Sequence, residues 1–311
     1  MKCKWIKKLT AGIIFLAAVG SLSGCQKAAT SENLFRDIEV NMTSVESAEE
    51  NQIVKLQMGD GDSAISQESN LDIEMTRNPA SVHRKGQQKT NMAGTKETQE
   101  MESYQVEEDG KTVIYSGTDE AWEKNAVEEK ETSSQQTVLF DGLQNLSGAF
   151  SVSQDLATVN KEECFELTGT ISGTQFQETF ADTLKALLGE DSSDLSGWNL
   201  QASEDEENNE ELQQKLNNVK VDCVIDIYRN NILPAKITFD LTDYLKAAGE
   251  ENAQVTSYTL EVTFVSYNDT KKIKVPKAVK ESAKDNGEDE AENSTDEMLE
   301  EENQEAAAEA E

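Results

Sequence analysis

Few residues in this sequence have the types and spacing that catalysis requires. His83 is the only histidine, and it lies on a strand-like run beside Arg84 and Lys85, where we expect a surface position. With one histidine, His-based metal clusters and most catalytic triads lack members. The nucleophile-elbow, P-loop and dinucleotide-binding glycine motifs do not occur in the sequence. We therefore predict a protein that is not an enzyme, with no catalytic residues, no metal and no cofactor.

Residues 60–64 hint at a different chemistry, calcium binding. The stretch reads Asp-Gly-Asp-Ser-Ala, like the beginning of a calcium loop. Ala64, Ile65 and Leu71, however, stand where such a loop needs an oxygen ligand, a glycine and the closing glutamate. We therefore reject a calcium site here.

Cys25 is the residue with the clearest chemistry, covalent acylation. It follows four lysines and an apolar run from Leu9 to about Val19. The run is shorter than the roughly 20 apolar residues that cross a bilayer, and its basic start is typical of a secretory signal. The tetrad Leu-Ser-Gly-Cys at 22–25 resembles the lipobox of bacterial lipoproteins, in which the cysteine is acylated and becomes the N-terminus.

This resemblance implies that residues 1–24 are a signal peptide, that Cys25 carries acyl chains such as palmitate, and that residues 25–32 are a tether. Two or three acyl chains hold a protein on a membrane more firmly than one chain does. We expect an extracytoplasmic protein anchored to the outer face of the cell membrane, and we favour a Gram-positive host. The alternative is a plain signal peptide in which Cys25 is incidental.

The net charge of −33 limits the partners of the protein. Nucleic-acid binding needs a basic surface, so we exclude it, and we expect a monomer. Residues 281–311 hold fourteen acidic residues and one lysine, which predicts a disordered acidic tail. A second acidic stretch, residues 201–215, is predicted to be a long surface loop.

The elements between these segments alternate between strands and amphipathic helices. A helix is predicted to start near Ser31, with Leu34 and Ile38 on its apolar side. Asp109-Gly110 predicts a tight hairpin between two strands. Further helices are predicted around 137–150 and at 174–188, and strand-like runs occupy 53–58, 70–77, 81–88, 98–107, 111–117, 164–171, 219–227 and 255–268. This order predicts one α+β domain over residues 33–280.

The helix predicted at 174–188 is the most regular one. Thr174 and Gln177 resemble a capping box, and Gly189 ends the helix. Its apolar stripe could line a cavity or fill a closed core, and it consists of Phe176, Phe180, Leu184, Leu187 and Leu188.

Cys164 and Cys223 remain after the predicted processing, and an extracytoplasmic site permits a disulfide. Cys223 shares its strand face with Val221 and Ile225, whereas Cys164 shares its face with Glu166 and Thr168. Side chains on opposite faces of a sheet cannot reach disulfide distance unless a bulge resets one strand. We therefore disfavour the bridge.

The order of these features resembles the envelope lipoproteins with a LolA-like fold, a group that includes LppX and LprG. The features are the lipobox, the opening helix, the hairpins ending in Tyr115 and Trp122, and a last long strand that closes on Val275-Pro276. The resemblance implies a curved antiparallel sheet that forms an open half-barrel, with helices on its concave side and acyl chains between them. It implies a protein that binds or shields a lipid or another amphiphile. The alternative is a non-enzymatic scaffolding lipoprotein with a closed core.

Overall fold

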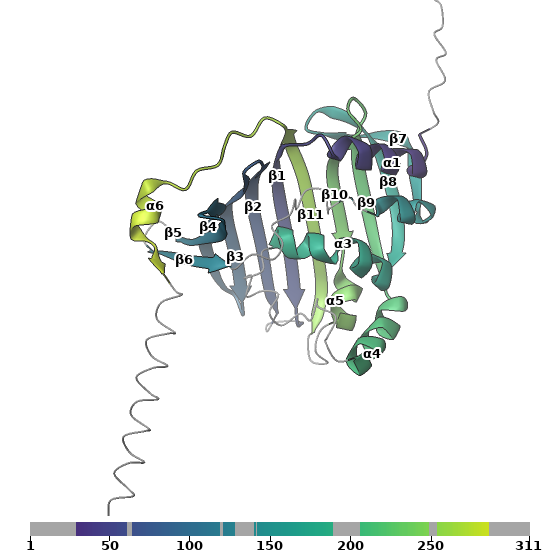
Figure 1. The fold of residues 1–311 in the computed structure, drawn as a ribbon. Coiled ribbons are helices and arrows are strands. Elements are labelled where there is room, and N and C mark those ends of the chain that lie inside the picture. Colours follow the sequence, from purple (N-terminus) through teal and green to yellow (C-terminus); the bar gives the residue numbers. More distant parts are fainter. Residues whose placement is uncertain are drawn as a thin grey trace, which may run out of the picture.

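The computed structural model describes residues 29–60, 64–118, 121–127, 140, 142–188, 206–248 and 254–285, with the backbone alone at 127, 181–188 and 206–211. The predicted signal peptide, Cys25 and residues 286–311 lie outside this range. Within it, the strands form one open sheet, and most of the helices lie on one side of that sheet (Figure 1).

The sheet has twelve strands in the order β12-β6-β5-β4-β3-β2-β1-β11-β10-β9-β8-β7. All neighbouring strands pair antiparallel except β12, which is parallel to β6. The strands are β1 (Ser47–Met58), β2 (Ile65–Arg77), β3 (Ala80–Met92), β4 (Thr95–Glu108), β5 (Lys111–Thr118), β6 (Ala121–Val127), β7 (Phe150–Val159), β8 (Glu162–Ser172), β9 (Lys220–Tyr228), β10 (Pro234–Asp240), β11 (Val255–Tyr267) and β12 (Lys284–Asp285).

The helices other than α6 gather over one face of the sheet, which we call the helix face. Contacts join α1 to β7, α3 to β8 and β9, and α5 to β9 and β11. The helices are α1 (Ser31–Met42), the 3-10 helix η2 (Leu143–Ala149), α3 (Gly173–Leu188), α4 (Glu206–Asn217), α5 (Thr242–Ala248) and α6 (Lys277–Ser282). The predicted α+β class, an open curved antiparallel sheet with helices on its concave side, is confirmed.

Short residue patterns in the sequence predicted where the β4–β5 hairpin turns and approximately where α3 begins. The β4–β5 hairpin turns at Asp109 and Gly110, whose φ angles of 53° and 75° are the left-handed values that a two-residue turn needs. The cap of α3 lies two residues earlier than predicted. The helix begins at Gly173, so the reciprocal pair is Ser172 and Gln175, with N–H···O distances of 3.1 Å and 3.0 Å.

Three segments differ from the sequence prediction. Residues 206–215 of the predicted acidic loop belong to α4, because Leu212 and Leu216 lie one turn apart and Leu216 is buried in the core. The helix predicted at 137–150 is only a 3-10 turn, which follows the left-handed Gly142, and Phe150 already begins β7. Residues 281–285, assigned to the tail, complete α6 and form β12.

Candidate functional site

The helix face has two parts, and the first is a packed core. Here α1, η2, α3 and α5 cover β7 to β11 and part of β1. Leu34, Phe35 and Ile38 of α1 point into this core at helical spacing, and the last two are completely buried. This part of the face holds the structure together by burial of apolar side chains.

Two of the predicted cavity residues fill this core. Phe176 and Phe180 are 0% and 1% exposed, and their ring centroids lie 5.7 Å apart. Each ring also makes an edge contact with Phe239, at 5.3 Å and 4.9 Å. The first two turns of α3 therefore pack as an aromatic cluster. The other three predicted cavity residues have side chains outside the described range; they are Leu184, Leu187 and Leu188.

The second part of the helix face, on β2 to β4, is built mainly from uncharged and half-buried side chains. Two charged residues also lie on it: Arg84, which pairs with Ile73 and Ser103, and the exposed Glu97, which pairs with Thr90. Directly paired residues of antiparallel strands share a face, so the pairs Ser69–Gln88 and Leu71–Gly86 both lie on the helix face. The uncharged set consists of Gln67, Ser69, Leu71, Gly86, Gln88, Thr90, Met101 and Ser103. Charged side chains alternate with it on the opposite face, and they are Glu68, Asp72, Glu74, Lys85, Lys89, Glu100 and Glu102.

Gly86 contributes to this surface through its missing side chain. A Cβ at this position would lie 2.0 Å from the backbone oxygen of Asn70. The backbones of β2 and β3 therefore approach each other here as only a glycine allows.

Glu50 and Gln52 lie at the border of the two parts, on the helix face of β1. Both are 1% exposed, and neither side chain has a hydrogen-bond partner in the part of the chain that the structure describes. Burial raises the pKa of the Glu50 carboxyl to about 8, and the positive charge of Arg84 acts in the opposite direction. Sequence analysis missed both residues because it began the strand at Ile53. The alternation of Val54, Leu56 and Met58 would have placed them on the buried face.

The opposite face of the sheet carries a strap, residues 268–285, which runs from the end of β11 across the sheet to β12 (Figure 1). Ile273, Val275 and Val279 of the strap are buried. They pack on a cluster from β4 to β6 that consists of Tyr104, Val106, Val113, Tyr115 and Trp122. The final segment of the fold thus covers β4 to β6 with a second, smaller core.

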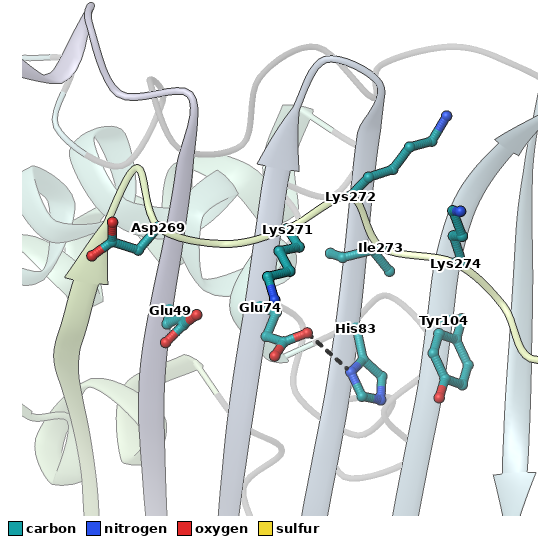
Figure 2. A pocket seen from close by; sticks show the side chains of 9 residues that line it. All are labelled: Glu49, Glu74, His83, Tyr104, Asp269, Lys271, Lys272, Ile273 and Lys274. Atoms are coloured by element: carbon teal, nitrogen blue, oxygen red, sulfur yellow. Dashed lines mark hydrogen bonds and ion pairs between the residues drawn. The ribbon is translucent and has the colours of Figure 1, made fainter.

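A hollow of about 410 Å³ lies between the strap and the sheet (Figure 2). Its floor comes from the strands, with Glu49 on β1, Glu74 on β2, His83 on β3 and Tyr104 on β4. The strap supplies the other wall, which consists of Asp269, Lys271, Lys272, Ile273 and Lys274. Charges of both signs therefore line an open surface hollow.

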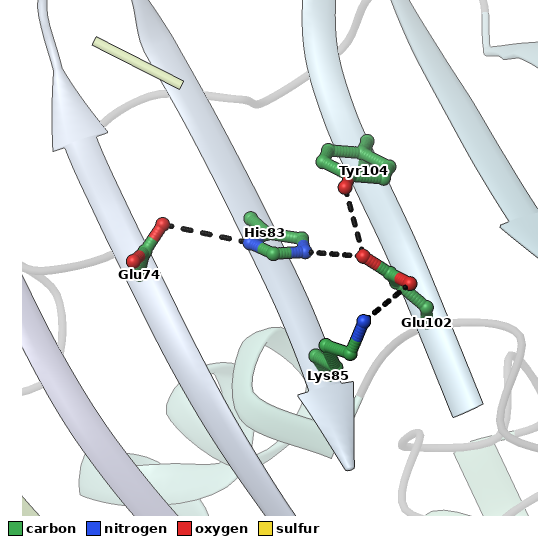
Figure 3. Close-up of polar contacts among 5 residues, drawn as sticks. All are labelled: Glu74, His83, Lys85, Glu102 and Tyr104. Carbon is green, nitrogen blue, oxygen red and sulfur yellow. Dashed lines mark hydrogen bonds and ion pairs between the residues drawn. The ribbon is translucent and has the colours of Figure 1, made fainter. Parts of the chain in front are cut away.

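His83 is half-buried at this hollow rather than on the open surface that the sequence predicted. Its ring is stacked on Tyr104, with centroids 4.3 Å apart, and its Nε2 lies 2.9 Å from a carboxylate oxygen of Glu102 (Figure 3). Its Nδ1 lies 3.5 Å from Glu74. Both ring nitrogens face carboxylates, so His83 links β2, β3 and β4.

Glu102 is the centre of this network. It accepts hydrogen bonds from the Tyr104 hydroxyl at 2.8 Å and from the Lys85 ammonium at 3.0 Å (Figure 3). Burial acts to raise the pKa of Glu102, but the hydrogen bonds from His83, Tyr104 and Lys85 outweigh it and lower the pKa. The network contains no serine, threonine or cysteine nucleophile, and its contacts stabilise the sheet.

The other candidate groups are separated in the fold. Cys164 lies on the strap face and pairs across the strands with Tyr228, whereas Cys223 lies on the helix face opposite Phe239. Both thiols are free and buried.

Among the described residues, no group of three or more His, Cys, Asp or Glu side chains could hold a metal ion. No helix of the described chain is long and apolar enough to span a membrane.

Comparison with known proteins places this fold in a family. The model of a family of unknown function, DUF6612, matches residues 30–284, nearly the whole described sheet. The chain belongs to this family. No curated protein matches the sequence.

Two solved structures are similar to this DUF6612 protein. LprF from Mycobacterium bovis is 12% identical, with a TM-score of 0.43, over 79% of this chain and 96% of that chain. The lipoprotein LppX from Mycobacterium tuberculosis is 12% identical, with a TM-score of 0.40, over 78% and 98% of the two chains. At this identity the likeness assigns no role to individual residues.

Proposed function

We propose that this protein is a non-enzymatic, lipid-anchored protein of the cell envelope that binds a lipid or another amphiphile on its helix face. The observation that supports this function is the uncharged surface of β2 to β4. Most charged side chains in the middle of these strands lie on the opposite face, so an apolar ligand on the helix face would have only Arg84 to avoid there. Leu71 and Met101 supply apolar contacts there.

Binding of a fluorescent fatty-acyl probe to the full-length protein tests this function. We expect saturable binding by the unmutated protein and at least tenfold weaker binding by Leu71→Glu, because an unpaired carboxylate in this surface is costly for an acyl chain to cover. Gln87→Glu is the matched control, since it adds the same charge to the exposed strap face of β3. Its binding should equal that of the unmutated protein. Equal loss in both variants would contradict a site on the helix face.

The alternative function, a scaffolding lipoprotein with a closed core, is favoured by one observation. The described side chains of α3 pack tightly against Phe239. If the folded, unmutated protein takes up no acyl probe, this alternative replaces amphiphile binding.

Membrane anchoring through Cys25 is the second part of the proposal. Only residues 26–29 separate this cysteine from Thr30, which caps α1, so the anchor would hold the domain close to the membrane surface. We expect Cys25→Ser to be unprocessed or released from cells, because the thiol is the acylated group. Detergent partition of the two proteins measures this. A Cys25→Ser protein that stays acylated in the detergent phase would show that the anchor lies elsewhere.

A further inference from the structure

Glu50 and Gln52 are polar residues whose side chains are buried without a hydrogen bond among the described residues. They lie on the central strand β1, two residues apart on the same face, and each is 1% exposed. All four of their side-chain oxygen and nitrogen atoms lack a hydrogen-bond partner in the described part of the chain. Each unmade hydrogen bond of a buried polar group costs about 1–3 kcal/mol, and native proteins contain few such groups.

The direct cross-strand neighbours of the pair are apolar, and the positive charge of Arg84 lies one strand beyond Ile73 on the same face. The cross-strand neighbours of Glu50 are Phe264 and Ile73. Those of Gln52 are Val262 and Leu71, the residue that also belongs to the uncharged surface of β2 to β4. An apolar residue of similar size at Gln52 would avoid the cost of burying an amide. Arg84 offers Glu50 an opposite charge, but neither Glu50 oxygen has a hydrogen-bond partner among the described residues. The pair needs an explanation other than stability.

The two side chains offer a defined pattern of hydrogen bonding. Gln52 has an amide that both donates and accepts. The raised pKa of Glu50 keeps its carboxyl protonated at neutral pH, so it too donates and accepts. Such a pair matches an uncharged partner with its own acceptors and donors, such as an ester, an amide or a hydroxyl group.

We propose that Glu50 and Gln52 form an internal polar subsite that binds an uncharged ester, amide or hydroxyl group of the amphiphile, next to apolar contacts from Leu71 and Ile73. This inference rests on the proposed function and specifies the ligand class. The polar atoms are shielded from water, so a ligand reaches them by displacing the side chains above. Phe140, whose ring lies 6.1 Å from Phe264, is one buried residue beside this position.

The test compares two fluorescent probes with the same fluorophore and chain length on the full-length protein. One probe is a monoacylglycerol, and the other is a hydrocarbon without an ester or hydroxyl. We expect the double variant Glu50→Leu with Gln52→Leu to bind the monoacylglycerol at least about tenfold more weakly, which corresponds to one or two lost hydrogen bonds. Its binding of the hydrocarbon should be unchanged or tighter.

Two further variants sharpen the comparison. Glu50→Gln keeps an uncharged donor and acceptor, so it should retain monoacylglycerol binding within about threefold. Lys55→Leu adds a leucine to the opposite, exposed face of the same strand and should change neither probe. Denaturant unfolding of each variant confirms that it is folded.

The outcomes separate this inference from the proposed function. If the unmutated protein binds neither probe, the proposed function itself is wrong. If it binds both probes and the double leucine variant binds them equally well, amphiphile binding stands and the polar subsite is wrong, with a trapped water as the partner of the pair. Tighter binding of a phosphorylated monoacylglycerol than of the uncharged one would overturn the ligand class and assign the contact to Arg84.

Discussion

At the residue scale, Glu50 makes the stability of the domain depend on pH. Its folded pKa of about 8 lies above the ordinary value of 4.5, so the folded state binds the proton more tightly than the unfolded state does. This contribution to the free energy of unfolding is fully present below about pH 4.5 and is lost as the pH rises toward 8. Glu50→Gln cannot ionise, so we expect it to gain stability relative to the unmutated protein between pH 5 and pH 8.

Urea unfolding of both proteins at several pH values measures this difference in the free energy of unfolding. The contributions of the other titratable groups cancel, because both proteins contain them. Glu49→Gln is the control, because Glu49 is the preceding residue on the opposite face of β1 and is less buried. A pH dependence that appears equally in Glu49→Gln would mean that it does not come from the burial of Glu50. A constant difference for Glu50→Gln would mean that Glu50 ionises normally in the folded protein.

At the element scale, the strap should be separable from the main core. Ile273 is 7% exposed and packs in the cluster that contains Tyr104 and Trp122, which is distinct from the core under the helices. We expect Ile273→Asp to release the strap, because burying an unpaired carboxylate there is unfavourable. In a Trp198→Phe background, the fluorescence of Trp122 should shift to the red, and the melting temperature should fall by about 5–10 °C.

Lys274→Asp is the matched change on the same segment. Lys274 is exposed one position further along the strap, so its substitution alters charge without burying it. The fluorescence of this variant should remain that of the unmutated protein. An unshifted spectrum in Ile273→Asp would show that the strap stays docked without its apolar contact.

At the scale of the whole molecule, charge concentrates at the C-terminus. Residues 286–311 contain twelve acidic residues and no basic one. Their removal should leave the melting temperature unchanged or slightly higher, because repulsion within a strongly acidic protein falls. Truncation after Lys280 should lower it, since that cut also removes β12 and the end of α6. Calorimetry of the two truncations compares them, and a loss of several degrees on removal of 286–311 alone would contradict this division.

The sequence by itself determined what depends on local periodicity and local chemistry. The alternation around Cys223 and Cys164 predicted opposite faces, and the structure places the two thiols on opposite faces of the sheet. Asp109-Gly110 predicted a hairpin because few dipeptides adopt two successive left-handed conformations. The opening helix, the long strand of β11 and the α+β class follow from the same periodic signals.

Only the tertiary structure decided what depends on contacts between distant segments. Glu50 and Gln52 look like surface residues in an acidic stretch, and they are buried because β2 and β11 pair on both sides of β1. His83 is half-buried because the strap, almost 190 residues later in the chain, crosses the face on which it lies. The register of the strands and the path of the strap are set by packing between elements. No local pattern of residue types encodes either one.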